Sequence, residues 1–155
     1  MSQSQDESQK ESSKNSTKDT MSESMKRLGE LFGKIGFDRA LAGIELLSAE
    51  DGNARVRLPV TESVQNMGGN LHGGAIATLV DDAGTIAILT ADRSSRPGVS
   101  TDLNVSFFAP APAGTSVIAE ASVLKTGKTL AFVSVDIRRE HDGALVAQGR
   151  MTKFL

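Results

Sequence analysis

A carboxylate, a carboxamide and a glycine-rich turn lie within one short stretch of this 155-residue chain. Asp81 lies in a run of apolar residues, the sequence Leu71-His72-Gly73-Gly74 precedes it, and Asn66 precedes both. Attack of water on a carbonyl carbon needs a base that takes a proton from water and donors that stabilise the developing oxyanion. These residue types can supply both, so the segment is a candidate site for acyl hydrolysis.

The turn at Gly73 is the first candidate for an oxyanion donor. The first N–H groups of a helix have no partner within the helix and lie at the positive end of its dipole. Glycine also lets a ligand approach the backbone closely. We therefore predict that the Gly73 amide is one donor, and that the Asn66 side chain adds a second N–H from the preceding loop.

Several roles fit the neighbouring acids and imidazoles. Adjacent helical positions point about 100° apart, so either Asp81 or Asp82 can be the inward residue, and an inward acid can also be purely structural. We expect Asp82 to be structural or solvent-facing. His72 is a possible general base, but a His just before a helix is more often a cap. His141, in a turn, is expected to be exposed.

The elements that position these residues are predicted from hydrophobic periodicity. Residues 1–24 are Ser-rich and contain no aliphatic residue beyond Met1 and Met21, which predicts a disordered tail. A domain over 25–155 then begins with an amphipathic helix. Its apolar stripe consists of Met25, Leu28, Leu31, Phe32 and Ile35.

The rest of the domain is predicted to be α+β. Two antiparallel strands, 44–49 and 54–58, flank the turn Asp51-Gly52-Asn53. Residues 73–91 are apolar almost all round, which predicts a buried helix. Four alternating segments, 98–108, 115–125, 129–140 and 144–154, predict an antiparallel meander. A curved antiparallel sheet wrapped around a long central helix would bury that helix.

This order of elements and four short motifs resemble the hotdog-fold thioesterases of the phenylacetate-type group. The motifs are Leu71-His72-Gly73-Gly74 after Asn66, Leu79-Val80-Asp81, Gly98-Val99-Ser100, and Ala147-Gln148-Gly149-Arg150. The segment 124–132 adds to the likeness, which covers about residues 26–155. The resemblance implies hydrolysis of medium- to long-chain acyl-CoA to fatty acid and CoA.

The resemblance also assigns roles to single residues. It makes Asp81 the general base, with a nucleophilic Asp81 as a variant, and Ser100 a residue that holds the attacking water. It gives Asn66 the polarising of the thioester carbonyl and His72 the orienting of the loop and substrate. The segment Phe107, Phe108, Ala109, Pro110, Ala111 and Pro112 would line the coenzyme or acyl channel.

A second segment, Lys125, Thr126, Gly127, Lys128 and Thr129, is a candidate CoA-binding site or a solvated hairpin turn, and the resemblance favours the first. It is not a P-loop, because Ser122 stands where the leading Gly is required and strands flank it. Position 154 holds Phe where members of this group often carry a polar or basic residue near the coenzyme, so we assign no phosphate contact there.

The spacing of the assigned residues implies more than one subunit. Asp81 lies eight residues after Gly73, roughly 12 Å along a helix that rises about 1.5 Å per residue. That is too far for both to act on one thioester carbon. The resemblance accordingly implies a homodimer in which Gly73 of one chain faces Asp81 of the other, and a homotetramer made of two dimers.

Composition excludes several other classes of function. The chain has no Cys, two His and a net charge of -2, so we expect no metal, no separate cofactor beyond the CoA of the substrate, and no nucleic-acid partner. The apolar run 75–89 is interrupted by two acids, so we expect no membrane span. The default localisation is cytoplasmic, with mitochondria as the alternative.

Two other functions compete with hydrolysis. Hotdog domains also serve as non-catalytic acyl-CoA-binding regulators, which need oxyanion donors but have no use for a base. A hotdog dehydratase acting on acyl-carrier thioesters would use His72 for proton transfer. The presence of Asp81 favours the hydrolase.

Overall fold

A computed structural model describes residue 23 and residues 25–92 and 94–155. The chain divides into two units, Met1–Leu31 and Phe32–Leu155. In the first unit, residues 25–31 are helical; Phe32 and Ile35, the last members of the predicted stripe, fall in a turn and a bend that follow. Apart from residue 23, the tail predicted over 1–24 lies outside the described residues. All site residues considered below belong to the second unit.

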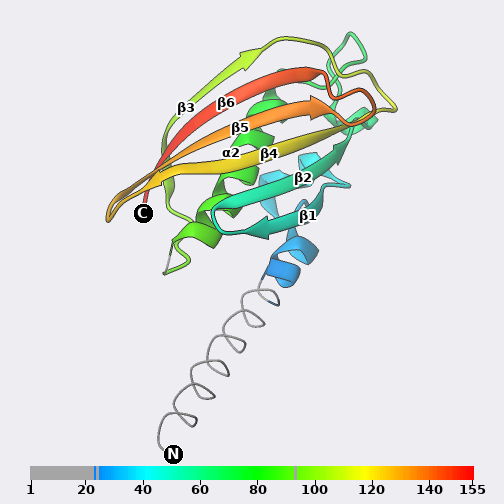
Figure 1. Cartoon of the computed structure of the whole chain (residues 1–155). Coiled ribbons are helices and arrows are strands. Elements are labelled where there is room, and N and C mark those ends of the chain that lie inside the picture. Colours follow the sequence, from blue (N-terminus) through cyan, green and yellow to red (C-terminus); the bar gives the residue numbers. More distant parts are fainter. Residues whose placement is uncertain (1–22, 24, 93) are drawn as a thin grey trace, which may run out of the picture. The chain divides into compact units, whose positions relative to one another are not determined.

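The second unit contains one six-stranded antiparallel sheet and one long helix (Figure 1). Every strand pair is antiparallel, and the sheet order is β1-β2-β4-β5-β6-β3. Two short 3-10 helices precede the long one. The elements are η1 (Gly36–Leu41), β1 (Glu45–Glu50), β2 (Asn53–Pro59), η2 (Glu62–Val64), α2 (Gly73–Ala91), β3 (Val99–Phe107), β4 (Ser116–Thr126), β5 (Leu130–Arg139) and β6 (Leu145–Phe154).

The predicted fold class is confirmed, and one predicted pairing is wrong. Strands β4, β5 and β6 form a meander, but β3 does not lie beside β4. It pairs with β6 at the sheet edge, and β2 takes the place beside β4. Alternation within a segment reports which side chains face the core but not which strand lies next to it, so the four-stranded meander could not be distinguished from this order.

Helix α2 is the centre of the hydrophobic core. Its residues Leu79, Val80 and Ala83 are fully buried, and the inward residues of β2, β4, β5 and β6 pack around it. By length and composition alone this helix could cross a membrane, but its contacts with the sheet identify it as the core helix of the domain.

Two glycines let α2 lie close to β6. A Cβ on Gly149 of β6 would collide with the Val80 side chain, and a Cβ on Gly84 of α2 would collide with the end of Met151. These contacts fix the middle of α2 against the inward face of β6. Polar side chains in the middle of α2 and on the inward face of β6 are therefore held close to each other.

Candidate active site

The loop before α2 is closed on itself by hydrogen bonds that use Asn66. Its backbone N–H donates to the Asn70 carbonyl (2.7 Å), and its side-chain Oδ1 accepts from the N–H groups of Gly68 (2.9 Å) and Asn70 (3.2 Å). A bridge between Gln65 and Leu71 closes the loop further. With Oδ1 engaged, the side-chain N–H groups of Asn66 are its free polar groups among the described contacts, as a donor role requires.

His72 is the N-cap of α2, as the capping interpretation predicted. Its Nδ1 accepts a hydrogen bond from the Gly74 N–H (2.8 Å). In a neutral imidazole this places the ring proton on Nε2, so the outward nitrogen is a donor. The Gly73 N–H, in contrast, has no acceptor among the described residues. The cap thus uses one glycine amide and leaves the other open.

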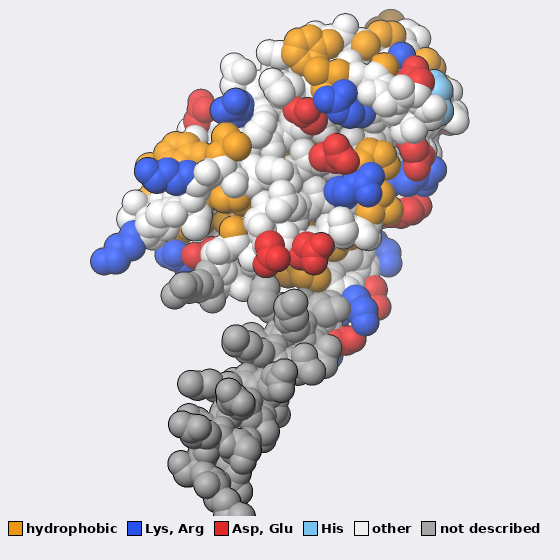
Figure 2. Space-filling model, in the orientation of Figure 1, with side chains coloured by type: hydrophobic (Ala, Val, Ile, Leu, Met, Phe, Trp, Pro, Cys, Tyr) orange, Lys and Arg blue, Asp and Glu red, His pale blue; other side chains and the backbone are white. Residues whose placement is uncertain are grey.

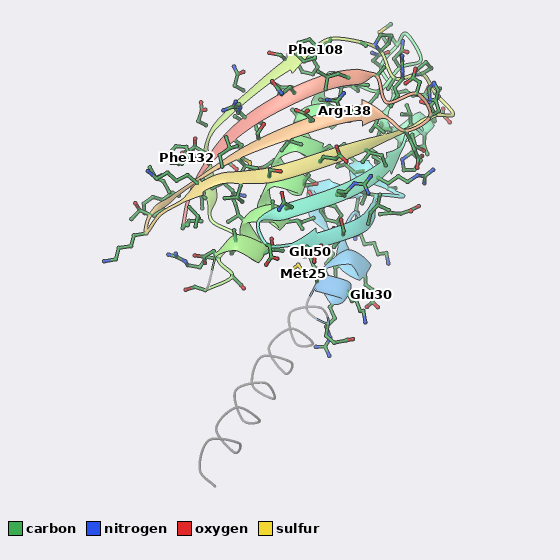
Figure 3. The ribbon with its side chains drawn as sticks, viewed as in Figure 1. Met25, Glu30, Glu50, Phe108, Phe132 and Arg138 are labelled. Atoms are coloured by element: carbon green, nitrogen blue, oxygen red, sulfur yellow. The ribbon has the colours of Figure 1, made fainter. Side chains whose placement is uncertain are left out.

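The segment after β3 runs beside this loop. Leu71 N–H donates to the Ala111 carbonyl (2.8 Å), and Asn70 forms a bridge with Pro112. A methyl group on Gly73 would meet the Phe107 ring at 3.5 Å. The predicted channel residues 107–112 therefore lie at the same end of the domain as Asn66 and Gly73. Ala111 is buried, whereas Phe107 and Phe108 are more than half exposed. Phe108 is labelled in Figure 3.

Asp81 and Ser100 meet two turns further along α2. The hydroxyl of Ser100, near the start of β3, donates to Asp81 Oδ1 (2.6 Å). The Asp81 side chain is 42% exposed, and Oδ2 has no partner among the described residues. The two residues predicted to handle water are thus brought together, with one carboxylate oxygen open.

Two side chains that sequence analysis did not single out complete this cluster. Lys153 Nζ lies 3.7 Å from Asp81 Oδ1 and donates to the Thr85 hydroxyl (2.5 Å). Thr85 in turn donates to the Asp81 carbonyl oxygen one helical turn earlier (2.7 Å). The available signal was the alternation of β6, in which Lys153 follows Gly149 and Met151 on the inward face.

Asp82 is not solvent-facing. Its Oδ2 is shielded from solvent and has no hydrogen-bond partner among the described residues. Burial, followed by the charges of Asp38 and Asp81, raises the pKa of Asp82 to about 7, and Lys153 opposes that rise. Of the two adjacent acids, Asp81 is therefore the one that presents an accessible carboxylate.

In the segment 125–129, Lys125 and Thr126 end β4, and residues 127–129 form the turn to β5, at the end of the sheet where β3 begins. Leu130 pairs with Phe154, which also pairs with Val99, and the Leu155 N–H donates to the Thr129 carbonyl. Figure 2 shows Lys or Arg side chains beside hydrophobic ones at this end. Lys125–Thr129 thus lie at the Ser100 end, and residues 107–112 at the Gly73 end.

The catalytic candidates of one chain consequently form two separate groups. Gly73 and His72 lie at the start of α2 and Asn66 in the loop before it. Asp81 lies in the middle of α2, where Ser100 from the start of β3 contacts it. His141 is exposed in the β5–β6 turn, as expected. Within residues 25–92 and 94–155, no group of His, Asp and Glu has the arrangement of a metal site.

Comparison with known proteins identifies relatives that cover most of the chain. Residues 68–146 match the sequence pattern of the thioesterase superfamily. Human acyl-coenzyme A thioesterase 13 is 47% identical over 119 residues, which cover 77% of this chain and 84% of the relative. The sequence resemblance described above is therefore confirmed.

Solved structures show the same architecture. The crystal structure of zebra fish thioesterase superfamily member 2 aligns with a TM-score of 0.78 and 42% identity, covering 83% of this chain and 95% of that one. The E. coli PaaI protein from the phenylacetic acid degradation operon aligns with a TM-score of 0.68 and 25% identity, covering 81% and 88%. The sheet wrapped around a central helix is shared with both.

Proposed function

The chain belongs to the thioesterase superfamily and is a thioester hydrolase, and from this premise we propose that it hydrolyses medium- to long-chain fatty acyl-CoA to free fatty acid and CoA. Asp81 is the general base in this proposal, and Gly73 and Asn66 supply the oxyanion donors. Coenzyme A enters only as the leaving group of the substrate, with no further cofactor.

The observation that carries the proposal is the contact between Ser100 and Asp81. The 2.6 Å hydrogen bond holds the carboxylate by Oδ1 and leaves Oδ2 open on a half-exposed side chain. A carboxylate that is held at one oxygen and open at the other can accept a proton from water at a defined position. A regulator that only binds acyl-CoA has no need of this arrangement.

The reaction follows from these groups. Water attacks the thioester carbonyl carbon while Asp81 Oδ2 takes its proton. The carbonyl oxygen becomes an oxyanion, which accepts hydrogen bonds from the Gly73 N–H and the Asn66 side chain. The carbonyl then re-forms as the carbon–sulfur bond breaks, and the proton taken up by Asp81 passes to the leaving thiolate, which gives CoA and returns Asp81 to its carboxylate form. His72, held as the cap, orients the turn and presents its Nε2 donor to the substrate.

We propose that each active site combines two subunits through the edge strand β3. Both faces of β3 are largely exposed, and within residues 25–92 and 94–155 it pairs only with β6. Phe107 marks the Gly73 end of β3 and Ser100 the Asp81 end. Antiparallel pairing of two β3 strands about Leu103 would bring the Gly73 end of one chain to the Asp81 end of its partner.

The same pairing would unite the two predicted binding segments. Residues 107–112 belong to the Gly73 end and Lys125–Thr129 to the Ser100 end, so one CoA molecule would contact both across the dimer. Leu124, Leu130, Phe132 and Phe154 are exposed near the β4–β5 turn. We propose that these apolar residues contribute to the association of two dimers into a tetramer.

The experiment that tests the proposal is thiol release from a panel of acyl-CoAs. We expect wild type to release thiol and Asp81→Asn to lose at least about 1,000-fold in kcat with little change in KM, since it lacks the base. Asp82→Asn is the matched control, because it neutralises the neighbouring acid on the same helix. It should retain the wild-type rate.

Two outcomes would contradict specific parts of the proposed function. A near-normal rate in Asp81→Asn would exclude Asp81 as the base. Binding of acyl-CoA by wild type without thiol release would favour the non-catalytic regulator. A single turnover in heavy-oxygen water separates the base from a nucleophile whose anhydride is opened at the Asp81 carbonyl carbon, because that Asp81 would carry the label in its own carboxylate.

A further inference from the structure

Lys153 is an unusual residue for the interior of this domain. It is 5% exposed, and it is the one buried Lys or Arg within the described parts of the chain. Burying an ammonium group is costly unless partners compensate for the lost hydration. Its partners here are the Thr85 hydroxyl and, at 3.7 Å, the Asp81 carboxylate.

The sheet register brings Lys153 and Ser100 to the same carboxylate oxygen. The two residues are cross-strand partners on β6 and β3, so their side chains lie on the same face. Ser100 Oγ lies 2.6 Å from Asp81 Oδ1 and Lys153 Nζ lies 3.7 Å from it. One oxygen of Asp81 is therefore held from two strands, and the other is left open.

Thr85 connects the same ammonium to the helix backbone. It accepts a hydrogen bond from Lys153 and donates one to the carbonyl oxygen of Asp81. Lys153 thus reaches Asp81 by two routes, through its charge at the side chain and through Thr85 at the main chain. Displacement of this ammonium would weaken both its contact with the Asp81 side chain and the link through Thr85 to the Asp81 main chain.

We infer that Lys153 is a positioning residue for the hydrolytic reaction: its buried ammonium, acting with Ser100, fixes the Asp81 carboxylate by Oδ1 so that Oδ2 faces the attacking water. The inference rests on the proposed function, because it assumes that Asp81 is the base. The inference adds to the site a residue, Lys153 of β6, that lies outside the sequence motifs of α2 and of the start of β3.

A purely structural role for Lys153 is the competing explanation. The acids near this ammonium are Asp81 and Asp82 on α2, with Asp38 of η1 also acting on Asp82. Lys153 could serve only to offset the negative charge of the shielded Asp82. In that case its removal would affect folding but would not specifically slow turnover.

The test is the steady-state kinetics of full-length Lys153→Met, which preserves length and removes the charge. We expect kcat for acyl-CoA hydrolysis to fall by about 10- to 100-fold, the cost of a misplaced catalytic group, while KM changes by less than about 3-fold. Arg150→Met is the matched control, since Arg150 lies on the exposed face of the same strand. It should keep the wild-type kcat.

Two double variants separate positioning from charge compensation. If Lys153 acts through Asp81, adding Lys153→Met to Asp81→Asn should cause no further loss in the residual rate. If it only compensates for Asp82, any loss of stability or of activity caused by Lys153→Met should disappear when Asp82→Asn is added. A wild-type kcat in Lys153→Met, or its restoration by Asp82→Asn, would overturn the inference.

The proposed function can fail independently of this result. Loss of activity in Asp81→Asn with a normal kcat in Lys153→Met would retain the base and reject the positioning role. Thermal melting checks that Lys153→Met folds. If it does not fold, Thr85→Val removes the acceptor of the ammonium with little change in volume, and we expect a loss in kcat of about 10-fold. An unchanged kcat there would reject the inference.

Discussion

The start of α2 and its middle present two differently constructed halves of a site. At the start, the chemistry comes mainly from the backbone: the Gly73 N–H is open, as the first N–H groups of a helix are, and the His72 cap uses the N–H of Gly74 instead. In the middle, it comes from side chains of three elements that converge on Asp81. A local motif can specify the first half, whereas the second depends on strand register across the sheet.

The strongest test of this contrast is complementation between two inactive chains. Asp81→Asn damages only the middle half and Asn66→Asp only the starting half. We expect kcat to fall by at least about 1,000-fold in the Asp81→Asn homodimer and by about 100- to 1,000-fold in the Asn66→Asp homodimer. Random mixing of equal amounts should restore about one quarter of wild-type activity, because half of the dimers would carry one intact site. Thiol release after co-refolding measures this.

The matched control mixes Asp81→Asn with Ser100→Ala, which damages the same half. No site in that heterodimer would be intact, so activity should stay low. If the first mixture also failed to recover while a heterodimer was seen by mass spectrometry, each site would have to lie within one chain.

Asn66→Asp separates the donor role of Asn66 from its role in the loop. The carboxylate can still accept from the Gly68 and Asn70 N–H groups, but it lacks the side-chain N–H for the oxyanion. We expect a loss in kcat of about 100- to 1,000-fold and little change in melting temperature. Kinetics and melting curves together measure this. Normal turnover would remove Asn66 from the set of donors.

Asp82→Asn should stabilise the protein in a pH-dependent way. Because the folded-state pKa is raised from 3.8 to about 7, the folded state binds more protons over this range, and stability falls as pH rises through it. The variant lacks this penalty. Its advantage should be small near pH 4 and reach on the order of 2–4 kcal/mol above about pH 7. Denaturant unfolding at several pH values measures it.

Asp142 provides a control of opposite sign. Hydrogen bonds from Arg139 and the Ala144 N–H lower the pKa of Asp142 to about 2, so its contribution stabilises the fold above the unfolded-state pKa and is lost as pH falls. Asp142→Asn should therefore destabilise the protein at neutral pH. An Asp82→Asn variant with the same stability difference at every pH would contradict the assignment of a raised pKa.

The smallest expected effect concerns the cap. His72→Ala should lower the stability by about 1 kcal/mol, since α2 loses its N-cap acceptor. His72→Asn should restore that stability because Asn is a strong N-cap residue, yet it lacks the imidazole Nε2 donor. Recovery of melting temperature without full recovery of kcat would separate the two roles. Full recovery of kcat would show that the cap alone matters.

Much of the fold could be predicted from periodicity, because each element has a clear local pattern. The helix over 73–91 and the strand segments agree closely with the structure. The placement of β3 beside β6 could not be predicted, since it depends on the order in which strands assemble around α2. The positive φ values of Asp51 and Gly52 explain why the β1–β2 hairpin was predictable from its turn.

The same distinction applies to the site. Gly73 and the His72 cap follow from a contiguous motif at a helix start. Lys153 was missed because its place in the site depends on the pairing of β6 with β3, which puts Lys153 opposite Ser100. The raised pKa of Asp82 comes from its burial and from the charges of Asp38 on η1 and Asp81, and helical angles alone show neither the burial nor the nearness of η1.

The exposed edge of β3 affects how a newly synthesised chain behaves before it meets a partner. A nine-residue strand with unpaired backbone groups and partly exposed Val99, Leu103 and Phe107 is a template for aggregation. In the proposed dimer, the partner strand removes this hazard in the same step that completes the site. Protection from aggregation and the gain of activity would then depend on a single event, the association of two chains.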